Sequence, residues 1–66
     1  MNVLNVNGRT AVTIAAVLVK ETPQAYQLNC EGDVHWFPKG CVRLNKDETA
    51  DIQTWILKQK FPNENY

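Results

Sequence analysis

The stretch AYQLNCEGDVHWF, from Ala25 to Phe37, decides the fold of this 66-residue chain. Its first half alternates apolar and polar side chains, which is the period of two of a β-strand. Glu31-Gly32-Asp33 is a tight connection, in which Gly32 is free to take the left-handed backbone conformation. The return strand runs from Val34 to Phe37 and ends at Pro38, which has no N–H to donate to a sheet. The stretch therefore predicts a β-hairpin.

The chain continues beyond this hairpin with a second turn and a further short strand. Lys39-Gly40 is typical of a turn, and Cys41 to Leu44 has the composition of a strand. Together with the hairpin, this predicts three strands in meander order, over Ala25–Cys30, Val34–Phe37 and Cys41–Leu44.

Upstream of the hairpin, the segment from Thr10 to Lys20 is rich in Val, Ile and Thr, which favours a strand. Asn7-Gly8 before it is a turn signal. The second half of the segment is apolar on both faces, which is typical of a strand that curls around a small barrel with a bulge at Ala15-Ala16. Its alanines leave a helix over the same residues as the alternative.

The chain after Leu44 allows two interpretations. In the first, Asn45 to Glu48 begins a helix, with Asn45 as its cap and Glu48 in the capping-box position. In the second, Thr49 to Gln53 is a strand of alternating polarity, and Thr54 caps a short helix from Trp55 to Lys60.

In the second interpretation, Trp55, Ile56 and Phe61 anchor the helix to the sheet. Lys58 and Lys60 suit the negative end of its dipole. We expect residues 1–9 and 62–66 to be loosely ordered at the two ends of one domain that spans residues 1–66.

Size and charge narrow the range of functions. A chain this short buries only about 60% of its unfolded surface, so its core is small and a deep substrate pocket is not expected. Seven basic residues balance seven acidic ones, which leaves no global attraction to nucleic acid or to an anionic membrane. Any basic patch must be local and made by folding.

The expected compartment is the cytoplasm. The longest apolar run, from Ile14 to Val19, is far short of the roughly 20 residues that span a bilayer. The N-terminal residues lack the charged head and cleavage site of a signal peptide. We therefore expect no membrane partner, and we expect Cys30 and Cys41 to stay reduced.

Metal binding and catalysis find little support in the sequence. Cys30, His35 and Cys41 are spaced C-x4-H-x5-C, without the fourth ligand that a structural zinc site needs. The chain contains no serine, and nothing points to a base that would activate either thiol. We expect no enzyme activity, no metal and no cofactor.

Three short motifs resemble a pattern found in a group of short phage and prokaryotic proteins of unassigned function. The motifs are K-E-T-x-x-A at Lys20–Ala25, W-x-P-K at Trp36–Lys39, and a Trp-Ile-Leu run at Trp55–Leu57 followed by lysines. The likeness covers about residues 18–61 and departs at Gly40, where the family has serine. It implies the extended form of Thr49–Gln53, and so a mostly β fold with a short C-terminal helix. The five strands would form a small curled meander or barrel, SH3-like or OB-like.

The candidate binding face is the aromatic and basic cluster of the hairpin. Because strand neighbours point to opposite faces, one of Trp36 and Phe37 must approach the surface beside Lys39. Arg43 follows nearby, and His35 lies opposite. Aromatic and basic side chains together can stack bases and hold phosphates. In the alternative, Trp36 only caps the barrel and both cations are solvated.

The function predicted from this cluster is a small non-catalytic binding module for nucleic acid or a nucleotide. The alternative is a protein-interaction module, such as a phage-type inhibitor or accessory subunit, that docks a host or phage protein through the same face or a free sheet edge. We also expect self-association to a homo-oligomer, because so small a chain gains core by pairing its exposed edges.

Overall fold

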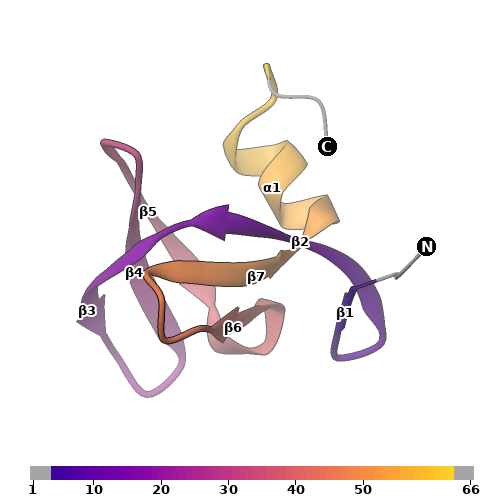
Figure 1. Ribbon diagram of the computed structural model, residues 1–66, viewed down its shortest axis with the longest axis horizontal. Helices are drawn as coiled ribbons and strands as arrows, with labels where there is room; N and C mark the ends of the chain where they lie inside the picture. Colours follow the sequence, from indigo (N-terminus) through magenta and orange to yellow (C-terminus); the bar gives the residue numbers. More distant parts are fainter. Residues whose placement is uncertain (1–3, 64–66) are drawn as a thin grey trace.

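A computed structural model describes residues 4–63 of the chain, and in them most residues lie in β-strands. One short helix follows the last strand and lies over one end of β2 and β7 (Figure 1). The predicted mostly β class with a short C-terminal helix is thereby confirmed. The elements are β1 Asn5–Val6, β2 Arg9–Ala15, β3 Val17–Glu21, β4 Ala25–Cys30, β5 Asp33–Pro38, a 3-10 turn Lys39–Cys41, β6 Val42–Leu44, β7 Thr49–Gln53 and α1 Thr54–Lys60.

The strands form two antiparallel sheets, not a single five-stranded meander. One sheet has the order β1-β2-β7-β6 and the other the order β3-β4-β5. The predicted hairpin is the β4–β5 pair, with Leu28 opposite His35 and Tyr26 opposite Phe37. The predicted third strand of the meander joins the other sheet, where Val42 pairs with Ile52. The 3-10 turn after Pro38 redirects the chain between the sheets, so the meander order is wrong for this strand.

The segment from Thr10 to Lys20 is extended, and the helix alternative is wrong. It divides into β2 and β3 at Ala16, whose N–H donates to the Glu48 carbonyl at 3.0 Å. The predicted irregularity at Ala15-Ala16 therefore takes the form of a break where the chain passes from one sheet to the next (Figure 1). A second register shift follows between Leu18 and Lys20.

The core lies between the two sheets and under the helix. Its buried members are Ala16, Leu28, Cys30, Phe37, Val42, Ala50, Ile52, Ile56 and Leu57. The predicted anchors of the helix are right for Ile56, and Phe61 packs partly buried against the core. Trp55 is not an anchor, because it lies on the outer side of α1 and stays 40% exposed, while Leu57 takes the inner position.

The helix begins at Thr54, so Gln53 holds the position of the cap. The Thr54 hydroxyl donates instead to the Thr10 carbonyl at 3.1 Å and ties α1 to β2. The segment from Asn45 to Glu48 is a turn between strands and not a helix start. Among residues 4–63, no helix has the length and hydrophobicity to span a bilayer.

The first strand begins at Asn5, within the segment 1–9 that the sequence predicted to be loosely ordered. β1 pairs with β2 through the turn Asn7-Gly8, in which both φ angles are positive, 50° and 81°, as such hairpin turns require. Glu31 and Gly32 have the same signature in the β4–β5 turn, with φ of 55° and 97°. Pro62 and Asn63 form a turn. The rest of the predicted loose ends, residues 1–3 and 64–66, lies outside the described residues.

Candidate functional site

Trp36 and Phe37 point to opposite faces of β5, as their alternation requires. Phe37 is fully buried and Trp36 is 41% exposed, so the stacking role proposed for either residue is open to Trp36 alone. Phe37, the other ligand-binding candidate, belongs to the core between the sheets and has no exposed surface on which a base could stack.

Lys39 contacts two other side chains of the protein. Its ammonium group binds the carboxylate of Glu21 on β3 and lies 5.0 Å from the centroid of the Tyr26 ring. The carboxylate of Glu21 therefore balances part of the positive charge that Lys39 brings to this surface.

Arg43 is held by a different carboxylate. Its Nε and Nη2 atoms donate to Asp51 Oδ2 at 3.1 and 3.0 Å. Lys39 and Arg43 therefore bind acidic side chains on different strands, β3 and β7.

Asp51 is a buried carboxylate with three donors around it. Thr13 and Asn45 donate to its Oδ1 atom, and Arg43 donates to Oδ2. Burial acts to raise the pKa of Asp51, but these hydrogen bonds and the charge of Arg43 outweigh burial and hold that pKa below its ordinary value. Asp51 is thus held in its ionised form, in which its carboxylate binds side chains of the strands on both sides of β7.

His35 and the two cysteines do not form a joint site. His35 packs edge-on against Phe61, with ring centroids 4.9 Å apart. Burial raises the pKa of both the Cys30 and the Cys41 thiol. Within residues 4–63, no group of three His, Cys, Asp or Glu side chains is placed to hold a metal ion.

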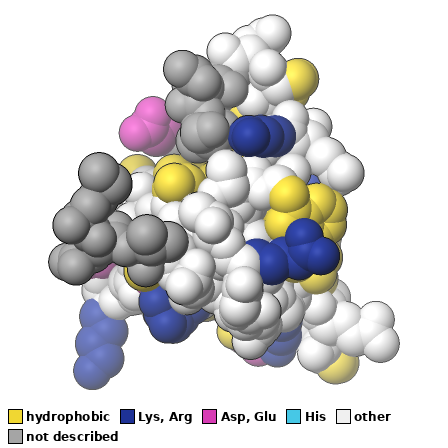
Figure 2. Space-filling view, turned by 90° about the vertical axis from the view of Figure 1, so that its right-hand side faces the viewer, with side chains coloured by type: hydrophobic (Ala, Val, Ile, Leu, Met, Phe, Trp, Pro, Cys, Tyr) yellow, Lys and Arg dark blue, Asp and Glu magenta, His cyan; other side chains and the backbone are white. Residues whose placement is uncertain are grey.

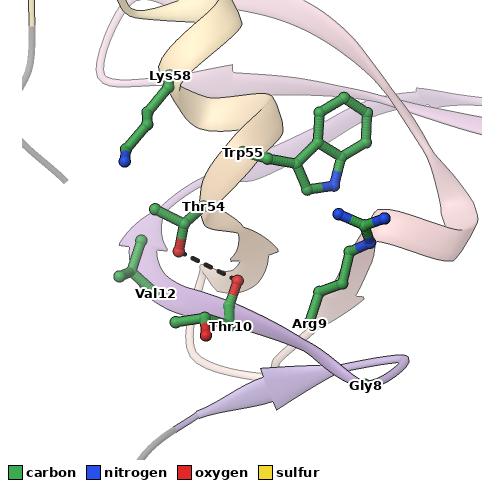
Figure 3. Close-up of a pocket in the computed structure, with 7 residues that line it drawn as sticks. All are labelled: Gly8, Arg9, Thr10, Val12, Thr54, Trp55 and Lys58. Carbon is green, nitrogen blue, oxygen red and sulfur yellow. Dashed lines mark hydrogen bonds between the residues drawn. The ribbon is translucent and has the colours of Figure 1, made fainter.

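The residue that sequence reasoning missed is Trp55. Its indole N–H donates to the Gln53 side chain, and the Gln53 amide donates in turn to the Val6 carbonyl at 2.7 Å. The Arg9 guanidinium lies 6.0 Å from the ring centroid, within the range of a cation–π contact (Figure 3). The β1–β2 turn that carries Arg9 is fixed by a hydrogen bond from Asn7 to the Gly40 carbonyl.

Two hollows lie on either side of Trp55. The first, called here the cationic hollow, has a volume of about 680 Å³ and is lined by Arg9, Thr54, Trp55 and Lys58 among others (Figure 3). The second, called here the tryptophan groove, has a volume of about 590 Å³. Trp36, Trp55 and Lys60 are among its walls. The i, i+3 spacing of Trp55 and Lys58 on one helix face is the sequence signal that could have revealed this region.

The charge around the two hollows is positive. In the part of the chain that the structure describes, neither hollow is lined by an Asp or Glu, and Arg9, Lys58 and Lys60 have no ion pair. Lys60 also borders a smaller hollow of about 290 Å³ that includes Asp33. On the face in Figure 2, basic side chains are spread over the surface, one of them at the right directly against a hydrophobic group, and acidic side chains show only near the margins.

Comparison of the chain with protein families, with curated proteins and with solved structures finds no match. The geometry and charge of the two hollows are accordingly the basis of the functional assignment.

Proposed function

We propose that this chain is a small non-catalytic module that binds nucleic acid through the face around Trp36 and Trp55. The observation that carries the proposal is that two half-exposed indoles line one groove, with cations on both sides of Trp55 that have no ion pair among residues 4–63. Aromatic platforms beside basic side chains bind nucleic acid by stacking bases and neutralising phosphates. Small curled β folds of the OB-like kind supply such platforms.

The local charge supports the proposal despite a net charge of zero. Two acidic residues, Glu21 and Asp51, pair with Lys39 and Arg43, and none of these four residues lines either hollow. The cations of the hollows have no acidic partner in the described part of the chain, which favours attraction of a phosphate backbone to this face.

The test is a titration of the protein with a single-stranded oligonucleotide of about ten nucleotides, followed by tryptophan fluorescence at two salt concentrations. We expect quenching, with an affinity that falls as salt is raised. Arg9→Ala and Lys58→Ala should each weaken binding and reduce the salt slope by about one.

The matched control is Lys46→Ala, which removes the same charge from an exposed position outside both hollows. It should bind like the unchanged protein. Absence of binding, or equal losses for Lys46→Ala and Lys58→Ala, would contradict the proposed face.

A second candidate function, self-association through a sheet edge, is favoured by β3. This strand lies at the edge of its sheet and exposes Val17, Leu18 and Val19 by 41–49% each. Exposed apolar edge strands pair readily with another chain, here a second copy. Sedimentation equilibrium should detect a dimer that Val19→Lys dissociates. A monomer at every concentration would rule this candidate out.

A further inference from the structure

The position of Trp55 between the two hollows specifies the ligand of the proposed face. Trp55 is a wall of both the cationic hollow and the tryptophan groove. A ligand that lies across this residue therefore meets two different surfaces, one with two cations and one with two indoles. A polymer that alternates flat bases with phosphates matches both surfaces at once.

The two sides of the indole are not equivalent. Arg9 lies over the ring from the cationic hollow, 6.0 Å from the centroid, and Arg9 is not part of the tryptophan groove. The side toward the groove is therefore the one left for a base, with Trp36 as a second aromatic wall. The Gln53 side chain holds the indole N–H, which fixes the orientation of the ring before a ligand arrives.

A base can reach these indoles only if one of its flat faces is uncovered. In a duplex both faces are covered by neighbouring base pairs, and exposing one requires unstacking. In a single strand the faces are accessible, and stacking on aromatic side chains is the usual mode of recognition.

We propose that the ligand is single-stranded nucleic acid that crosses Trp55, with a base in the tryptophan groove beside Trp36 and an adjoining phosphate in the cationic hollow, whose walls include Arg9 and Lys58. This inference rests on the proposed function and adds the strandedness of the ligand and the place of each of its parts. Three cations and no described carboxylate in the walls provide the charge complementarity for the phosphate.

The experiment compares a fluorescein-labelled single strand with the blunt duplex of the same sequence, by fluorescence anisotropy on the full chain. We expect the single strand to bind at least about tenfold more tightly than the duplex. Trp36→Ala and Trp55→Ala should each weaken single-strand binding about tenfold, whereas Trp36→Phe and Trp55→Phe should retain most of it, because phenylalanine still stacks.

Val34→Ala is the matched control, since Val34 is exposed on the same face of β5 as Trp36 and lines neither hollow. Circular dichroism melts show whether each variant is folded, and the phenylalanine variants keep the test decisive if an alanine variant is not. Val34→Ala should bind as the unchanged protein does.

The outcomes separate the two proposals. Equal binding of single strand and duplex would overturn the single-strand inference and leave nucleic-acid binding standing. Preference for the single strand with no loss in either folded tryptophan variant would overturn the assignment of the base to the groove. Binding of neither probe would overturn both the proposed function and this inference.

Discussion

Asp51 and Gln53 are two buried polar residues of β7 that lie two positions apart on one side of the strand. They differ in charge, and so they differ in their effect on the arginine near each of them. Asp51 pairs across the sheet with Thr13 on one side and Arg43 on the other, and its carboxylate neutralises the guanidinium. Gln53 is uncharged. It binds the Val6 carbonyl and the Trp55 indole, and Arg9 above that indole keeps its charge.

The difference shows how one strand can pair the cation of one region with a carboxylate and leave the cation of the neighbouring region available to a ligand. A carboxylate balances the positive charge of the cation beside it, whereas an amide forms hydrogen bonds with buried polar groups without adding charge. The Asp51 region is therefore expected to serve stability, and the Gln53–Trp55 region to serve binding. Each of the following predictions tests that division.

The largest effect is expected for Asp51→Ala. The substitution leaves Thr13 and Asn45 without their acceptor and removes the partner of Arg43, which should lower the free energy of unfolding by about 2–4 kcal/mol. Thermal melts followed by circular dichroism should show a fall of roughly 10 °C or more.

Arg43→Ala is the control for this measurement and should cost less. The Arg43 side chain is 56% exposed, and Asp51 retains two donors without it. A loss of about 1 kcal/mol is expected. Equal losses in the two variants would mean that the ion pair, and not the whole network, stabilises this region.

Acid should destabilise the protein through the same residue. The pKa of Asp51 is held below its ordinary value of 3.8, so the unfolded chain binds this proton more readily than the folded one. The stabilisation is fully present above about pH 5 and is lost as the pH falls through the lowered pKa. Unfolding measured across this range should show a flatter acid limb in Asp51→Asn, and an unchanged limb would contradict the role of Asp51.

Gln53→Ala should have a smaller effect on stability and a specific effect on Trp55. Losing the hydrogen bond to the Val6 carbonyl should cost about 1–2 kcal/mol, because that carbonyl is left without its partner. With its N–H released, Trp55 should be more mobile and more accessible to a fluorescence quencher. The measurement is made in a Trp36→Phe background, so that Trp55 is the only tryptophan, and its fluorescence is excited selectively over that of the tyrosines. Unchanged quenching would show that Gln53 does not position the ring.

Local pattern predicted much of this fold. The β4–β5 hairpin follows from the alternation of Tyr26 to Cys30 and from Gly32, whereas the polarity of Thr49–Gln53 allowed the extended form of β7 only as one of two alternatives. The two-sheet arrangement depends on Ala16 and on the 3-10 turn after Pro38, where the chain changes sheets. Those changes are set by long-range packing, which strand periodicity does not report.

The site was predictable only in part. Alternation in β5 requires that one of Trp36 and Phe37 be exposed, but the choice depends on which face meets the core. Whether a cation is available depends on partners far along the chain, such as Glu21 for Lys39. Trp55 was assigned to the core because aromatic residues usually anchor short helices, and its exposure follows from the burial of Ile56 and Leu57 on the opposite side of α1.

The smallest effect is expected for the two cations that the sequence favoured as ligands of phosphate. Lys39→Ala and Arg43→Ala should each change single-strand affinity by less than about twofold, because an exposed charge bound to a carboxylate contributes little net attraction. Arg9→Ala, measured in the same titration, should lose clearly more and should alone reduce the salt slope by about one. Affinities are compared at a temperature where all three variants are folded, so that the stability cost of Arg43→Ala does not enter. A loss for Lys39→Ala as large as that for Arg9→Ala would place the phosphate near the 3-10 turn, and the division between a closed Asp51 region and an open Trp55 region would fail.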